Sequence, residues 1–143
     1  MTALEDHAAI VALTHDYCWA LDTGEWDALR SVFTPDVVTD LGAGGQNGID
    51  EVIARVSSAL GRLDDSQHIV ATHQIRIDGD SATCRCYLHA QHILRDTPGG
   101  DHFIVGGRYE DRCIRTPDGW RIAERSLVVM WREGNTAVFG RAS

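Results

Sequence analysis

The hydrophobic pattern of this chain changes once, between residues 60 and 68, from a helical repeat to that of β-strands. Before that point, apolar side chains recur three and four positions apart, as in Ile10, Leu13, Tyr17 and Leu21, a spacing typical of one face of an amphipathic helix. After it, long runs rich in β-formers are separated by turn residues, a pattern typical of strands. Because helices come first and consecutive strands follow, the order predicts an α+β fold.

Three helices and one short strand are predicted in the first half. The first helix ends at Thr23-Gly24, and a shorter one spans Glu25–Val32 before Pro35, which cannot continue a helix. A third helix spans Ile49–Leu60, with two acidic residues in its first turn, where they favour the helix dipole. Between the second and third helices we expect a short strand and then the glycine-rich turn GAGGQNG, with the strand at Val37–Leu41.

The second half predicts four strands joined by hairpin turns. Asp78-Gly79-Asp80 and Pro117-Asp118-Gly119 are typical hairpin turns. The strands are placed near His68–Ile77, Ala82–Leu94, His102–Arg115 and Trp120–Trp131. We therefore expect one domain, residues 1–143, in which the helices cover one face of an antiparallel sheet.

Charge and hydropathy exclude several classes of partner. The formal net charge is −8, which disfavours binding to nucleic acid or to anionic membranes. No apolar run approaches the roughly 20 residues that a membrane-spanning helix needs. The first ten residues lack the layout of a signal peptide, so a cytoplasmic location is expected. Asp64-Asp65, Glu110-Asp111 and the scattered arginines are interpreted as surface charge.

The cysteines and histidines do not predict a metal site. Four cysteines are present without a C-x-x-C pair, and they are interpreted as small buried residues. His89 and His92 are three residues apart on one predicted strand, so their side chains point to opposite faces. His73 lies five residues after His68 and, without a bulge, also points away from it.

Three segments of the chain, in this order and spacing, resemble one known family. They are ALDTGEWDALRSVFTPDVV, QHIVATHQIRIDGDSATCRCYLHAQHIL and GGRYEDRCIRTPDGWRIAERSLVVMW. Together they resemble the SnoaL-like, polyketide-cyclase-like branch of the nuclear transport factor 2-like superfamily. The resemblance implies a cone-shaped curved sheet wrapped against three N-terminal helices, enclosing a deep apolar pocket.

Within that family, the site pattern is similar to that of dehydratases acting on hydrophobic rings, of the bile-acid 7α-dehydratase and scytalone-dehydratase types. Such a site carries a tyrosine, an aspartate five residues later and a histidine on the first long strand, matched here by Tyr17, Asp22 and His68. The 7α-dehydratase type has a further acidic residue on the next strand, where this chain has Ala90. The resemblance therefore implies a simpler Asp–His dyad.

These three residues suit proton transfer without a cofactor. His68 is the expected general base, because imidazole titrates near neutral pH. Asp22 would orient the ring and stabilise the imidazolium, and Tyr17 would donate a hydrogen bond to a carbonyl or leaving hydroxyl. An ideal helix rotates by about 140° over five residues, so Tyr17 and Asp22 converge only if the helix ends near Leu21.

Strand alternation predicts which residues line the pocket. On the second long strand, Leu88 and His92 share the apolar face. On the last strand, Val128 and Met130 are expected to face the pocket or core, and the opposite face requires cover by another subunit or by the C-terminal tail. The residues of this opposite face are Leu127, Val129 and Trp131, and the tail residues that would cover them are Val138 and Phe139.

Three functions remain open from the sequence. The first is a cofactor-independent lyase or isomerase acting on a small hydrophobic cyclic molecule, in a homodimer or homotrimer. The second is a binding protein for such a molecule without turnover. The third is an accessory subunit of a ring-hydroxylating dioxygenase, because the same fold serves that role.

Overall fold

The computed structural model describes residues 1–42 and 44–139. Residue 43 of the predicted glycine-rich turn and the last four residues of the predicted tail lie outside this part. The helical elements are α1 Ala3–Thr23, η1 Trp26–Ser31, α2 Ile49–Leu60 and a short C-terminal η2 Thr136–Phe139. The strands are β1 Phe33–Asp40, β2 Gly45–Asn47, β3 Asp65–Asp78, β4 Ser81–Ile93, β5 His102–Thr116 and β6 Gly119–Gly134.

Local sequence explains the ends of the long first helix. The Thr2 side chain accepts a hydrogen bond from the Glu5 backbone N–H, and the Glu5 side chain accepts one from the Thr2 N–H, which forms a capping box. Gly24 ends the helix in the left-handed conformation, with φ of 71°, which glycine adopts without steric cost. The helix therefore runs two residues beyond Leu21.

The six strands form one curved, unclosed sheet in the order β2-β1-β6-β5-β4-β3. All neighbours are antiparallel except β1 and β6, which run parallel. The predicted α+β class is confirmed, but the expectation of a purely antiparallel sheet is wrong at this one pair. β1 and β6 are far apart in the sequence, and the parallel pairing needs a long crossover connection, which the hairpin signals do not reveal.

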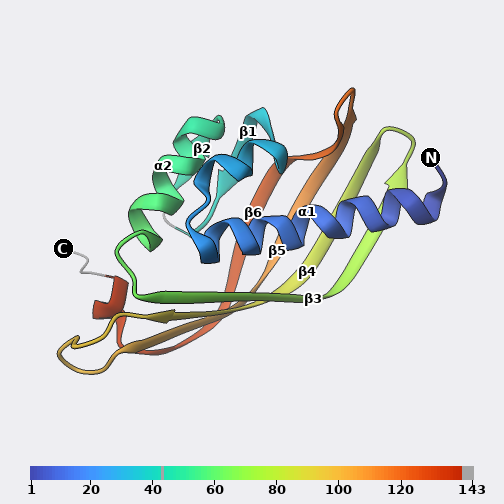
Figure 1. Ribbon diagram of the computed structural model, residues 1–143. Helices are drawn as coiled ribbons and strands as arrows, with labels where there is room; N and C mark the ends of the chain where they lie inside the picture. Colours follow the sequence, from blue (N-terminus) through green and yellow to red (C-terminus); the bar gives the residue numbers. More distant parts are fainter. Residues whose placement is uncertain (43, 140–143) are drawn as a thin grey trace.

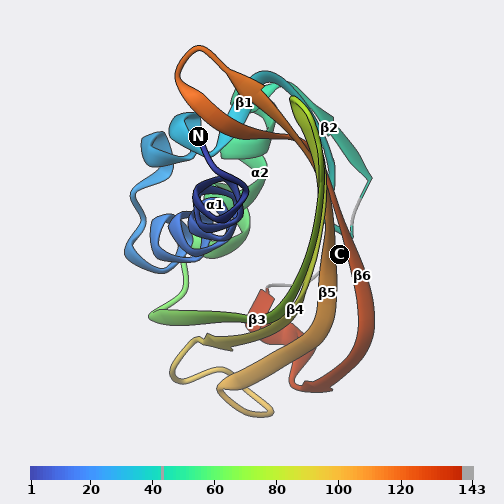
Figure 2. The same ribbon diagram turned by 90° about the vertical axis from the view of Figure 1, so that its right-hand side faces the viewer.

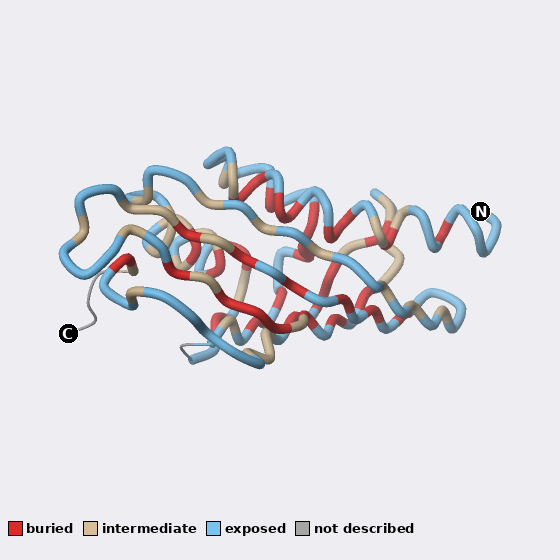
Figure 3. The backbone as a smooth tube through the Cα atoms, turned by 90° about the horizontal axis from the view of Figure 1, so that it is seen from below, coloured by how far each residue is buried: buried red, intermediate tan, exposed pale blue. Residues whose placement is uncertain are grey.

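The helices lie in the concave side of this sheet. In Figure 2, α1 is seen end-on inside the curve formed by β3 to β6, with α2 beside it. One side of α1 buries Ile10, Leu13, Tyr17 and Leu21, as their spacing predicts. Burying each large apolar side chain contributes about 1.5–3 kcal/mol. In Figure 3 the buried residues gather in the middle of the molecule, and the main buried cluster joins residues of α1, α2 and the strands, which locates the core in the concavity.

Among the hairpin-linked strands β3 to β6, three β-bulges interrupt the alternation of side chains. On β3 the bulge includes Thr72, with φ of 61°, and it turns His73 to the inner side. On β6 the extra residues are Ala123 and Met130. A one-residue bulge exchanges the inner and outer faces for every residue that follows. The two bulges on β6 therefore decide which residues of the last strand face the interior.

No helix in residues 1–42 and 44–139 is long and apolar enough to cross a membrane. All four cysteines are buried and unpaired, which confirms their interpretation as small core residues.

Candidate active site in the concave face

The end of α1 and the beginning of β3 bring Asp22 and His68 into direct contact. Asp22 Oδ1 lies 2.6 Å from His68 Nδ1, which is a hydrogen-bonding distance. The His68 side chain is 5% exposed and that of Asp22 17%, so both are largely shielded from water. A charge-assisted contact of this length is among the stronger hydrogen bonds in proteins.

Further hydrogen bonds hold the Asp22 carboxylate in place. The His68 backbone N–H donates to Oδ2 over 2.8 Å, and the Ser66 hydroxyl donates to Oδ1 over 2.9 Å. Because an ionised carboxylate only accepts hydrogen bonds, the ring contact requires the proton on His68 Nδ1. The second ring nitrogen, Nε2, then carries the lone pair and is available as a base.

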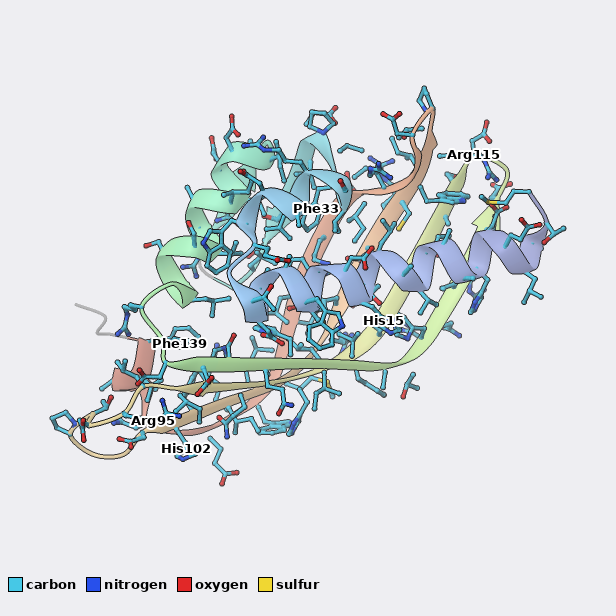
Figure 4. The ribbon with its side chains drawn as sticks, in the orientation of Figure 1. His15, Phe33, Arg95, His102, Arg115 and Phe139 are labelled. Atoms are coloured by element: carbon cyan, nitrogen blue, oxygen red, sulfur yellow. The ribbon has the colours of Figure 1, made fainter. Side chains whose placement is uncertain are left out.

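His68 lines an interior cavity of about 110 Å³. The cavity lies between α1, α2 and strands β3 to β6, and its wall is mainly apolar or aromatic. Phe139 of η2 lines it at one end of the sheet (Figure 4). The expected pocket residues Tyr17, Leu88 and His92 are all in this wall. The full lining is Tyr17, Leu21, Leu41, Arg55, Val56, Ala59, Leu60, His68, Leu88, Ala90, His92, Val105, Tyr109, Leu127 and Phe139.

His68 also borders a larger groove between α1 and β3, of about 720 Å³. Asp22 and Trp19 belong to this groove, and Trp19 is 68% exposed. His15 of α1, labelled in Figure 4, faces the same strand. The Asp–His pair therefore lies between an exposed groove and the buried cavity.

Tyr17 and Asp22 do not converge on one pocket, because α1 continues to Thr23. Tyr17 lines the cavity, whereas Asp22 lines the groove. The Tyr17 ring packs edge-on against Phe33 and Tyr109, with centroids 5.7 and 5.6 Å apart. Burial raises the pKa of Tyr17, and the nearby Arg125 cation partly opposes that rise, so its hydroxyl remains a donor at neutral pH.

His92 is a buried neutral histidine beside the pair. Its Nδ1 lies 2.9 Å from the Phe103 carbonyl, a contact that requires Nδ1 to donate. Its ring packs edge-on against His68, with centroids 5.8 Å apart. Desolvation lowers the pKa of His92 to about 4, although the bond to Phe103 opposes the shift. His92 therefore presents an uncharged Nε2 acceptor to the cavity wall.

The expected orientation of the last strand is wrong for two of the substrate-binding residues. Val128 and Met130 lie outside the cavity wall, with Met130 53% exposed, whereas Leu127 lines it. The bulge at Ala123 exchanges the two faces of β6, which turns Leu127 and Val129 inward. The second bulge, at Met130, leaves Trp131 on the outer side as expected.

A buried ion pair in this concavity was missed by the sequence interpretation. Arg125 and Asp111, expected at the surface, are both fully buried, with paired contacts of 2.8 Å (Nε to Oδ1) and 2.7 Å (NH2 to Oδ2). The guanidinium lies 4.4 Å from the Tyr17 ring centroid and 3.9 Å from that of Tyr109. The only available signal was that strand alternation, corrected for the bulge, places both residues on the inner face.

Residues 1–42 and 44–139 contain no evident metal-binding centre. No group of three or more histidine, cysteine or acidic side chains there is arranged to hold an ion. His73, turned inward by its bulge, places Nε2 2.8 Å from Thr14 Oγ1 on α1, and this contact joins β3 to the helix.

Comparison with known proteins identifies relatives along most of the chain. The model of the SnoaL-like domain family matches residues 2–126. An uncharacterized protein of Mycobacterium tuberculosis is 34% identical over 129 residues, covering 85% of this chain and 84% of the relative. Terrestric acid biosynthesis cluster protein E of Penicillium crustosum is 28% identical, covering 97% and 92%.

Solved structures with the same fold extend over nearly the whole chain. A protein of Kribbella flavida superposes with a TM-score of 0.90 at 28% identity, covering 99% of this chain and 100% of the other. Two proteins of Novosphingobium aromaticivorans follow. A "putative aromatic ring hydroxylase" has a TM-score of 0.86, 26% identity and coverages of 97% and 99%. A "putative scytalone dehydratase" has a TM-score of 0.84, 20% identity and coverages of 98% of this chain and 97% of the other.

Proposed function

Since the chain belongs to the SnoaL-like domain family, we propose that it is a cofactor-independent lyase or isomerase for a small hydrophobic cyclic molecule. One observation carries the proposal. The Asp22 carboxylate lies 2.6 Å from His68 Nδ1, and the same imidazole borders a mainly apolar cavity. A base oriented in this way meets the geometric requirement for abstracting a proton from bound substrate.

In the proposed reaction, His68 Nε2 removes a proton from a weakly acidic C–H bond. The C–H electron pair moves into the substrate, and the proton forms a new N–H bond on the imidazole. Asp22 stabilises the resulting imidazolium through Nδ1, as the aspartate of a catalytic triad does. The cycle closes when a leaving group departs with that proton, which is elimination, or when the proton returns to another carbon, which is isomerisation.

Tyr17 is the proposed donor to substrate oxygen. Its side chain is 2% exposed and belongs to the cavity wall, where a hydroxyl donor stabilises developing negative charge more strongly than it would in water. Leu88 and His92 would contact the substrate from β4. The oxygen would then lie in the cavity, whereas Asp22 lines the groove.

The size of the cavity limits the buried part of the substrate. Sites for drug-sized ligands measure about 300–1,000 Å³, whereas this cavity measures about 110 Å³. A cavity of about 150 Å³ holds benzene. Because this cavity is smaller than that, we propose that only part of a ring or a smaller group enters it, and that the larger portion of the substrate extends into the groove.

Deuterium exchange tests proton abstraction without requiring the natural substrate. Cyclohexanone and related small cyclic ketones are incubated with the protein in D2O, and loss of the signal next to the carbonyl is followed by NMR. The wild-type protein should accelerate exchange, and His68→Gln should reduce that acceleration by roughly 10²–10⁴-fold.

His89→Gln is the matched control, because His89 is an exposed histidine on β4, outside the cavity wall. It should exchange at the wild-type rate. Equal exchange by the wild-type and His68→Gln proteins would contradict the assigned base.

The accessory-subunit alternative keeps one supporting observation, the 26% identity to a "putative aromatic ring hydroxylase". A subunit of that kind, or a binding protein, would bind cyclic molecules without accelerating exchange. Line broadening of cyclohexanone signals with unchanged exchange would favour these alternatives over the enzyme.

A further inference from the structure

Arg55 on α2 is a cation in the cavity wall with no role in the reaction as derived above. It is the only arginine among the lining residues, and no aspartate or glutamate accompanies it there. Its Nε is buried and has no hydrogen-bond partner within the described part of the chain. A buried donor without a partner has a substantial desolvation cost, and a ligand oxygen would offset it.

The acidic side chain placed to pair with Arg55, that of Glu51, accepts a hydrogen bond from another residue. Glu51 lies four residues earlier on α2, the spacing at which opposite charges meet on a helix. Its Oε1 instead accepts the Asn47 backbone N–H over 3.0 Å. The buried unpartnered nitrogen of Arg125 differs, because that guanidinium lies against two aromatic rings and pairs with Asp111.

We propose that Arg55 receives the substrate oxygen on which negative charge develops, and that the substrate is therefore a neutral cyclic carbonyl compound. This inference rests on the proposed function. When His68 takes the proton from the carbon next to the carbonyl, the C–H electron pair forms a C=C bond to the carbonyl carbon and the C=O π pair moves to the oxygen, which gives an enolate. Arg55 then faces an oxyanion that did not exist before proton transfer, which is selective stabilisation of the charged state.

The overall charge of the protein favours a neutral substrate. A net charge of −8 opposes the approach of an anion over long range. A carbonyl compound enters uncharged, and its negative charge appears together with the positive charge on His68. Arg55 thus contributes to the reaction without having to attract an anionic substrate from solution.

Binding of 4-nitrophenol tests this role independently of turnover. The phenol resembles the neutral substrate and the phenolate resembles the enolate, and the two forms absorb at different wavelengths. Affinities measured across pH give the preference of each protein for phenolate over phenol. The wild-type protein should prefer phenolate by roughly 10–100-fold, the range for a hydrogen bond to a charged group.

Variants assign that preference to a residue. Arg55→Met should reduce it to less than about threefold, and Arg55→Lys should retain most of it. Arg55→Gln gives the same comparison should Arg55→Met fold poorly. Arg76→Met, an equal charge change at an exposed position of β3, should behave like wild type. His68→Gln should keep the preference, which separates Arg55 from a protonated His68.

Several results would overturn the proposal. They are no binding of the probe to the wild-type protein, an unchanged preference in Arg55→Met and Arg55→Gln, or loss of the preference in His68→Gln alone. Deuterium exchange that depends on His68, combined with an unchanged preference in Arg55→Met, would remove Arg55 from the mechanism and leave the base intact.

Discussion

Two acid–base pairs lie inside the same concave sheet, and they differ in what each leaves available. Asp111 and Arg125 are both 0% exposed, and two nitrogens of the guanidinium contact two oxygens of the carboxylate. Asp22 and His68 remain slightly exposed, and only one ring nitrogen is engaged. The first pair has its two charges paired within the protein, whereas the second leaves one ring nitrogen of His68 outside the contact.

This difference separates a structural pair from one suited to chemistry. Burial opposes the charge of Arg125, yet Asp111 keeps the pKa of that guanidinium well above its ordinary value, so the residue stays charged at any relevant pH. Histidine changes its charge near neutral pH. Proton transfer needs a group of the second kind, and the buried arginine is better understood as support for the Tyr17 and Tyr109 rings that it contacts.

The largest expected effect is on the open pair. In Asp22→Asn, the amide nitrogen would replace an oxygen next to His68 and favour the tautomer with its proton on Nε2, which cannot act as a base. We expect the rate of deuterium exchange to fall by roughly 10²–10⁴-fold. In thermal or urea unfolding, Asp22→Asn should lose less stability than a variant with Asp111 substituted. The opposite ranking would contradict the distinction between a structural pair and a pair suited to chemistry.

The closed pair should show the reverse behaviour. Asp111→Asn leaves the Arg125 charge buried without its counter-ion, and breaking such a pair costs about 3–5 kcal/mol of the free energy of unfolding. Urea denaturation measures this loss. Asp80→Asn serves as control, because its ion pair with Arg115 is largely exposed on the Asp80 side, and it should change stability by less than about 1 kcal/mol.

His92 should make the stability of the protein depend on pH. Its pKa is about 4 in the folded protein and about 6.5 when unfolded. Between these values the unfolded chain binds the extra proton, so stability is complete above about pH 6.5 and falls as the pH is lowered to about 4. This contributes up to about 3 kcal/mol.

His92→Asn keeps a donor for the Phe103 carbonyl and removes the titrating group. Urea denaturation at pH 7 and pH 4.5 should therefore show a smaller acid-induced loss than in wild type. An identical loss in both proteins would assign the effect to other groups.

Substitutions on the outer face of the sheet are expected to have the smallest effect on the candidate active site. Met130 and Trp131 of β6 are partly exposed there, as are Ile69 of β3 and Tyr87 of β4. Such a patch favours self-association, and we expect a dimer or trimer in solution. Met130→Glu should weaken it, with little change in deuterium exchange. Sedimentation of the wild-type protein as a single 15.7 kDa species would contradict this expectation.

The C-terminal tail does not provide the alternative cover in the part that the structure describes. Val138 is fully buried against Phe103 and Val105 on the inner side. Phe139 packs on His92, with ring centroids 4.5 Å apart. The described tail therefore closes the end of the cavity and leaves the outer face as it is.

Hydrophobic periodicity predicted the helices and strands well, but it predicted poorly which residues of the last strand face the interior. The repeat of Ile10, Leu13, Tyr17 and Leu21 defined the buried side of α1, because a helix continues its period without interruption. Strand alternation failed at Val128 and Met130, since the bulge at Ala123 depends on pairing with β5. Nothing in the local sequence marks that register.

The prediction that Asp22 and His68 form a pair came from the family resemblance and not from a physical pattern in the sequence. The two residues are 46 positions apart, and no periodicity links the end of a helix to the beginning of a strand. The burial of Asp111 and Arg125 was equally hidden, because charged residues on strands usually face water. Tertiary pairing decides both cases, and composition carries no information about it.

The bulge at Ala123 has a consequence for genetic change in this protein. Ile122 and Glu124, on either side of it, already pair with the adjacent residues Cys113 and Arg112 of β5. Deleting the Ala123 codon would therefore leave a regular strand in which Arg125 and Leu127 keep their present facing. Deleting a codon within the regular stretch after Arg125 would instead reverse the side chains between the deletion and the second bulge. The gene should therefore accept in-frame loss of Ala123 far more readily than in-frame loss of a codon in that stretch.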